Sequence, residues 1–82
     1  MINLITIKID CEMDETTLNE TIFENKKYYD IKTIGFKDYV LFTGTKDNLS
    51  KLISYYITDN PSEIKNLLMN HKLKFMDKQK CL

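Results

Sequence analysis

Apolar and polar residues alternate near the start of the chain. Ile5, Ile7 and Ile9 are separated by a threonine and a lysine. A period of two residues is typical of a β-strand with one apolar face turned toward the core. We therefore expect a first strand over residues 3–10, with its isoleucines pointing inward.

The next segment carries the signals of a helix start. Asp14 is suited to cap a helix, and Met13 and Leu18 are spaced to form a hydrophobic staple around it. Lys26 and Lys27 suit the C-terminal end of this helix, because cations are favourable there. We predict a helix over residues 15–26 with a narrow apolar stripe.

Two later runs, residues 28–36 and 39–45, are rich in aromatic and β-branched residues. Only Lys37 and Asp38 separate them, so the runs predict a β-hairpin. The tight turn that suits a hairpin best needs a positive φ at both central residues, and this pair does not favour it. We expect either a longer turn or a bulge at Gly35.

The hairpin predicts apolar side chains on both faces of the sheet. If Phe36 pairs with Tyr39, then Ile34 faces Leu41 on one face. The residues predicted for the other face are Ile31, Val40 and Phe42. Helices packed on one side cover only one of these faces, so the other needs a cover. The candidates are a last strand or tail, a second protomer, another protein, or a third helix that wraps over it.

Helical spacing is clearest in the second half of the chain. Five apolar residues recur at i, i+3, i+4, i+7 and i+8, namely Leu49, Leu52, Ile53, Tyr56 and Ile57. Thr45 or Asp47 can cap this helix. Asn60, Pro61 and Glu63 suit the first positions of a third helix. Its apolar residues are Ile64, Leu67 and Leu68.

The expected order of elements is β, α, β, β, α, α, with an optional final β. Beyond His71, the apolar residues Leu73, Phe75 and Met76 either form a short edge strand or extend the third helix. The order resembles ferredoxin-like domains, which contain a split βαβ arrangement. We predict a small α+β fold, βαββα(α)(β), with an antiparallel sheet and helices mainly on one face. It forms a single domain over residues 1–82 with a basic tail at 77–82, and its predicted core includes Ile7, Leu18, Leu41, Leu52, Ile53, Leu67 and Leu68.

Length and motif content argue against an enzyme. A chain of 82 residues forms one modest core and has little room for a deep catalytic cleft. His71 is the only histidine, and no motif nominates Ser50, Ser54 or Cys81 as a nucleophile beside it. Cys11, His71 and Cys81 lack the short paired spacing of structural zinc ligands. We expect no catalytic residue, metal, cofactor or small-molecule substrate.

Charge is balanced overall but divided along the chain. Twelve basic and twelve acidic residues give zero formal charge, and every basic residue is a lysine. Lysine lacks the bidentate guanidinium that recognises phosphate or guanine, so sequence-specific nucleic-acid binding is disfavoured. Residues 10–24 contain acidic residues and no lysine, whereas lysines dominate the C-terminal end. We expect an acidic and a basic pole.

The N-terminal sequence lacks the pattern of a signal peptide, and the longest apolar runs are far below the roughly 20 residues that span a bilayer. These features predict a cytoplasmic protein that makes no membrane contact. In a reducing compartment, Cys11 and Cys81 would remain thiols.

Taken together, these features favour a small non-enzymatic protein-binding module. The absence of Ala, Arg and Trp indicates an AT-rich coding genome, such as that of a phage or mobile element. We expect an inhibitor of a host defence protein that acts by steric occlusion, with a host protein or a second copy of the chain as its partner. The predicted partner-binding residues are Tyr28, Phe36, Tyr39, Tyr55, Lys72 and Lys74.

The sequence is also compatible with a second function. The lysine-rich C-terminal end and the aromatic residues could serve a nucleic-acid-associated ferredoxin-like module, in which bases stack on Tyr or Phe rings. The zero net charge makes this alternative less favoured than protein binding.

Overall fold

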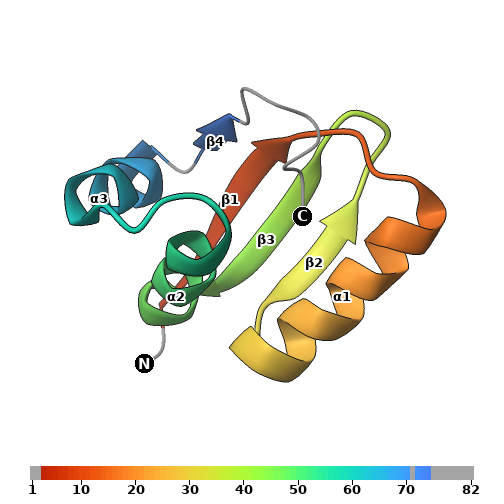
Figure 1. Cartoon of the computed structure of the whole chain (residues 1–82), viewed down its shortest axis with the longest axis horizontal. Coiled ribbons are helices and arrows are strands. Elements are labelled where there is room, and N and C mark those ends of the chain that lie inside the picture. Colours follow the sequence, from red (N-terminus) through yellow and green to blue (C-terminus); the bar gives the residue numbers. More distant parts are fainter. Residues whose placement is uncertain (1–2, 71, 75–82) are drawn as a thin grey trace.

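The computed structural model of the protein describes residues 3–70 and 72–74. In these residues, a β-sheet packs against helices (Figure 1). The elements in chain order are β1 (Leu4–Asp10), α1 (Glu15–Tyr29), β2 (Lys32–Gly35), β3 (Val40–Thr45), α2 (Lys46–Tyr56), α3 (Pro61–Asn70) and β4 (Lys72–Lys74). The predicted α+β class is confirmed. The order β, α, β, β, α, α is compatible with a ferredoxin-like arrangement.

Within the described residues, the strands lie in the order β2-β3-β1-β4. The first three strands are antiparallel neighbours, as expected, but β4 pairs parallel to β1. Two helices explain this direction. A single helix after β3 would lead to a strand parallel to β3. The second helix reverses the chain direction once more, so β4 runs opposite to β3 and parallel to β1. Residues 72–74 therefore form an edge strand and do not extend the last helix.

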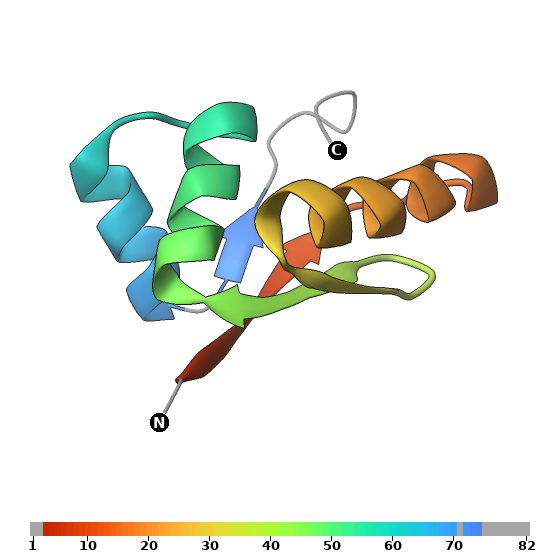
Figure 2. The same cartoon turned by 90° about the horizontal axis from the view of Figure 1, so that it is seen from below.

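The helices of the described residues, α1, α2 and α3, lie on the same face of the sheet (Figure 2). The hypothesis that the third helix wraps over the second face is therefore wrong. α3 packs beside α2, and the opposite face carries no helix from the described residues. This layering decides which strand residues form the core and which meet solvent.

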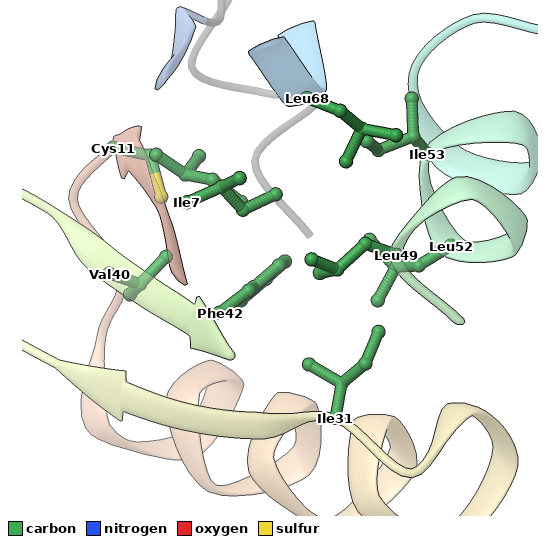
Figure 3. Packing of buried hydrophobic residues seen from close by; sticks show 10 residues of the cluster. Ile7, Cys11, Ile31, Val40, Phe42, Leu49, Leu52, Ile53 and Leu68 are labelled. Carbon is green, nitrogen blue, oxygen red and sulfur yellow. The ribbon is translucent and has the colours of Figure 1, made fainter. Parts of the chain in front are cut away.

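The core lies between the sheet and α2 (Figure 3). Phe42 points from the sheet toward Leu49 of α2, and neither side chain is exposed. The buried apolar residues are Ile7, Ile9, Cys11, Ile31, Val40, Phe42, Leu49, Leu52, Ile53 and Leu68. The inward direction of β1 is confirmed by the burial of its isoleucines, of which Ile5 is partly buried.

Three members of the predicted core are not fully buried. Leu18 and Leu67 pack against the core at its margin and are partly buried. Leu41 lies on the helix-free face, so its assignment to the core is wrong. The alternation of β3 places Val40 and Phe42 toward the helices and Leu41 between them on the other side.

The first helix is longer than its sequence predicts. Tyr28 and Tyr29, expected in a strand, form the last turn of α1. The helix ends because Asp30 adopts a left-handed conformation with φ 52°, and the N–H of Ile31 then donates to the carbonyl of Asn25 at 3.0 Å. Asn25 also donates from Nδ2 to Thr33 Oγ1 at 2.9 Å, which joins α1 to β2 inside the core.

The hairpin register is confirmed, but its expected irregularity is absent. Ile34 pairs with Leu41, and the N–H of Phe36 donates to the carbonyl of Tyr39 at 2.8 Å. The pairing runs without a skipped residue through Gly35, so the predicted bulge is wrong. Among the described residues other than glycine, only Asp30 has a positive φ, so the two-residue turn closes without the conformation that its residues disfavour.

Gly35 has a packing role that the sequence alone does not show. A Cβ at this position would overlap the end of the Leu18 side chain, because α1 lies directly on β2 there. A glycine inside a strand often marks such a close approach of another element.

The predicted helix caps are confirmed. Asp14 Oδ1 accepts the N–H of Thr17 at 2.7 Å, and Thr45 Oγ1 accepts the N–H of Asn48 at 3.1 Å. Asn60 Oδ1 accepts the N–H groups of the second and third residues of α3 at 2.9 and 3.4 Å. Each cap satisfies backbone donors that have no partner within the helix.

The cysteines differ from expectation. Cys11 is buried at the end of β1 and is disulfide-bonded, so the prediction of a thiol at this position is wrong. The other cysteine of the sequence, Cys81, and the predicted basic tail over 77–82 lie outside the described residues. The disulfide also removes the cysteine argument for a reducing compartment.

Truncation of Leu52 tests the packing of α2. Leu52→Ala is expected to lower the free energy of unfolding by about 2 to 5 kcal/mol, because it leaves a cavity in the core. The exposed neighbour Lys51 serves as the control, and Lys51→Ala should change stability by less than about 0.5 kcal/mol. Chemical denaturation measures both variants. Equal, small losses would contradict the burial of this side of α2.

A double-mutant cycle tests the close approach of α1 to β2. Gly35→Ala is expected to destabilise the protein by about 1 to 3 kcal/mol, because the new methyl group overlaps Leu18. In a Leu18→Ala background the same change should cost less, since the overlapping atoms are gone. Additive losses in urea denaturation would show that the two residues do not touch.

The decrease in stability at acidic pH tests the N-cap of α1. The backbone and side chain of Thr17 hydrogen-bond to Asp14 and lower the pKa of its carboxyl below the ordinary value of 3.8. The stability from the charged cap is therefore present above about pH 4 and is lost as the pH falls. Asp14→Ala should lower the urea midpoint at neutral pH. Asp14→Asn should keep the urea midpoint at neutral pH but make it fall less as the pH is lowered. A midpoint that falls with pH as in the wild type would contradict the assignment.

Candidate functional site

The helix-free face of the sheet carries a group of apolar and aromatic side chains near the hairpin turn. This hairpin patch consists of Lys8, Ile34, Phe36, Tyr39 and Leu41. Ile34 is 40% exposed and Phe36 is 46% exposed. Leu41 lies between two neighbours, because it pairs with Ile34 of β2 and with Lys8 of β1. Three strands therefore contribute to one continuous surface.

The rings of Phe36 and Tyr39 stack on each other. Their centroids are 4.6 Å apart with an interplanar angle of 15°. The Nζ of Lys8 lies 4.5 Å from the centroid of the Tyr39 ring, within the range of a cation–π contact. Lys8 also lies 3.7 Å from the carboxylate of Asp10. These contacts hold the aromatic side chains in defined positions before any partner arrives.

The rest of this face is more polar. The hydroxyls of Thr6 and Thr43 form a hydrogen bond of 2.8 Å between β1 and β3. Lys32 is exposed on β2. Leu4 is the apolar exception, because it is 63% exposed, but it lies at the end of β1 far from the hairpin turn. The apolar character is therefore concentrated at the hairpin end and bordered by polar groups.

The predicted partner-binding residues fall on two separate surfaces. The structure brings Phe36 and Tyr39 together in the hairpin patch, as expected from their pairing. Tyr28 and Tyr55 lie in the helical layer, on α1 and α2, where they are 67% and 75% exposed. Tyr28 and Tyr55 therefore do not share the sheet face with Phe36 and Tyr39. Lys72 and Lys74 belong to the edge strand β4.

Three tyrosines form a second aromatic group between α1 and α2. Tyr55 meets Tyr56 edge to face at 4.7 Å, and Tyr56 meets Tyr29 at 6.3 Å between centroids. Burial raises the pKa of Tyr29 and of Tyr56, and the neighbouring tyrosines and Glu24 add to this effect. Both hydroxyls are therefore protonated at neutral pH.

An acidic cleft of about 230 Å³ opens beside this group. It is lined by Thr17, Glu20, Thr21, Glu24, Asn25 and Tyr56. Glu20 and Glu24 are exposed and lie one helical turn apart, so their carboxylates border the same side of α1. The cleft offers oxygen acceptors and negative charge, which favour a cationic group.

The described residues, 3–70 and 72–74, contain no group of three or more His, Cys, Asp or Glu positioned to hold a metal ion. His71 lies outside them, so its role stays a prediction. In the same part of the chain, none of the helices has the length and apolar character that a bilayer crossing requires.

Sequence reasoning missed Lys8 as a member of the hairpin patch. The alternation of apolar and polar residues along β1 places Lys8 on the polar side of that strand. Its contact with Tyr39, however, depends on β1 lying next to β3 in the sheet. The acidic cleft was missed for a related reason. A run of carboxylates along a helix does not show which of them face another helix.

Comparisons of the chain with protein-family models, with curated proteins and with solved structures give no match.

Proposed function

We propose that the protein is a non-enzymatic protein-binding module and that the hairpin patch is its contact surface. The observation that supports this proposal most directly is the exposure of Ile34 and Phe36 on the sheet face that carries no helix from residues 3–70 and 72–74. Exposed apolar side chains grouped on one face and rimmed by polar residues are typical of interaction sites. Isolated exposed apolar residues would carry no such meaning.

The arrangement of the hairpin patch suits a protein partner. Interface cores are enriched in aromatic residues, and binding energy is concentrated in a few of them. Phe36 and Tyr39 are stacked, so they lose little side-chain freedom when a partner covers them. Lys8 and Asp10 place a pair of opposite charges at the border of the apolar area. A partner with an apolar surface and a polar rim would complement it.

The narrower form of the proposal is an inhibitor encoded by a phage or mobile element, which acts by covering a surface of a host defence protein. Small size and the AT-biased composition support this form. Steric occlusion requires only a contact surface, so the lack of a catalytic motif in the sequence is compatible with it.

Substitution of the patch tests the proposed contact. Phe36→Lys places a charge in the apolar centre and should weaken partner binding at least about tenfold, because central aromatic residues dominate interface energies. Tyr55→Lys is the matched control, since it makes the same type of change at an exposed aromatic residue of the helical layer. Capture from host lysate identifies stoichiometric partners, and calorimetry with the purified partner measures the affinities.

Light scattering coupled to size exclusion separates a host partner from a second copy of the chain. A dimer that Phe36→Lys dissociates and Tyr55→Lys preserves would make the partner a second copy. A monomer whose Phe36→Lys variant keeps wild-type stability and partner affinity would overturn the patch as the contact surface. A labelled oligonucleotide retained in a salt-dependent gel shift would instead favour the nucleic-acid alternative.

A further inference from the structure

The first half of β1 has an edge that no described strand covers. On one side, β1 pairs with β3 from Leu4 to Ile9. On the other side, it pairs with β4 only from Lys8 to Asp10. Among the residues that the structure describes, the start of β1 therefore has a neighbouring strand on one side alone. Such an edge presents backbone N–H and C=O groups that can pair with another strand.

The hairpin register shows how the backbone groups of β3 are directed. The N–H of Phe36 donates to the carbonyl of Tyr39, so these two residues form a hydrogen-bonded pair. Hydrogen-bonded and non-hydrogen-bonded pairs alternate along antiparallel strands, so Leu41 also bonds to β2. Successive residues of a strand direct their backbone groups to opposite neighbours. The next residue, Phe42, therefore bonds to β1.

The same alternation identifies the free groups on β1. Phe42 is paired with Ile7, so the backbone groups of Ile7 and, two residues earlier, of Ile5 point to β3. The N–H and C=O groups of Leu4 and Thr6 then point to the uncovered side. A second strand can meet them there without disturbing the pairing of β1 with β3.

A small pocket lies beside this edge on the helical side of the sheet. It has a volume of about 230 Å³ and is lined by Ile5, Lys46, Lys65, Leu68 and Met69. Three of these residues belong to α3, which lies on the side of β1 away from β3 (Figure 1). Pockets for drug-sized ligands measure roughly 300 to 1,000 Å³. The smaller volume here suits one apolar side chain that enters between β1 and α3.

The charges at the pocket indicate what kind of segment it accepts. Lys46 and Lys65 come from different helices, and neither forms an ion pair with another described residue. Among the described residues, no acidic residue lines the pocket. A second copy of the chain on this edge would bring these lysines toward their own counterparts across a twofold axis. Charge complementarity therefore favours a different chain that carries acidic residues.

We propose that the first half of β1 binds an extended segment of a partner protein, with an apolar side chain in the pocket and acidic side chains beside Lys46 and Lys65. The segment adds to the sheet in line with β4. Strand addition derives affinity from main-chain hydrogen bonds and specificity from pockets for alternate side chains. The edge supplies the hydrogen bonds, and the pocket supplies the specificity. The site shares no residue with the hairpin patch and is independent of the function proposed for it.

A capped peptide with the sequence Glu-Thr-Leu-Thr-Glu tests the proposal on the full chain. In an extended conformation its leucine and glutamates lie on one side, toward the pocket and the lysines, and its threonines lie on the other. NMR titration should show saturable shifts at Leu4 and Thr6. The same peptide with lysines in place of the glutamates should bind at least about threefold more weakly, because the ion pairs are lost. No saturable binding of the acidic peptide would overturn the proposal.

Methylation of the peptide backbone tests strand pairing. An extended segment directs every second amide to the neighbouring strand, whichever way it runs. One peptide is methylated on the two threonine nitrogens, and the other on the nitrogens of the leucine and the second glutamate. One of them should lose at least about tenfold in affinity, because its donors to β1 are blocked, and the other should stay close to the parent peptide. Equal affinities of the two methylated peptides would overturn strand addition.

Charge reversal on the protein tests the two lysines. The double variant Lys46→Glu with Lys65→Glu should reverse the preference, so that the lysine peptide binds more tightly than the glutamate peptide. The variant should fold, because both positions are exposed and an acidic residue suits the first turn of α2. The matched control, Lys27→Glu with Lys51→Glu, changes the net charge equally at exposed positions outside the pocket and should keep the wild-type preference. An unchanged preference in the first variant, or an equal change in the control, would overturn the proposal.

Two measurements separate this site from the hairpin patch and from self-association. Phe36→Lys should leave the affinity for the glutamate peptide unchanged, so each contact surface is tested by itself. Light scattering coupled to size exclusion should show no dimer that the peptide dissociates. Such a dimer would make a second copy the occupant of this edge and would overturn the proposal.

Discussion

One constraint shapes the whole molecule: a single layer of helices covers one face of the sheet. Burial of apolar surface is favourable by about 25 cal/mol per Å², and within residues 3–70 and 72–74 the helices provide it on one face of the sheet. The inward residues of β1 and β3, with Phe42 among them, accordingly pack with residues of α2 and α3. The alternate apolar residues of β2 and β3, Ile34 and Leu41, point to the face on which the described residues place no helix, and they belong to the hairpin patch.

The seam between α1 and β2 depends on two small features. Gly35 leaves space for Leu18, and the buried Asn25 amide is satisfied by the hydroxyl of Thr33. An unsatisfied amide in this position would cost more than the bond itself contributes, so the polar pair also specifies how the helix sits on the strand. The seam places α1 on an edge strand of the sheet, where a covering helix limits pairing with other chains.

The two faces of the molecule offer different chemistry. The hairpin patch is apolar and aromatic with one cation at its border, whereas the helical layer presents tyrosines and the acidic cleft. The first surface suits contact with another protein through exclusion of water. The second suits a cationic group, because the carboxylates of Glu20 and Glu24 border it.

Much of the local structure is determined by the sequence itself. Helix caps at Asp14, Thr45 and Asn60, the inward isoleucines of β1 and the hairpin register follow from residue type and spacing, because they depend on neighbours within a few positions. Only the tertiary structure decided that α3 lies on the same face as the other helices, that Tyr28 belongs to a helix and that Leu41 meets solvent. It also decided which aromatic residues and carboxylates come together. These outcomes depend on contacts between segments far apart in the chain, which periodicity does not encode.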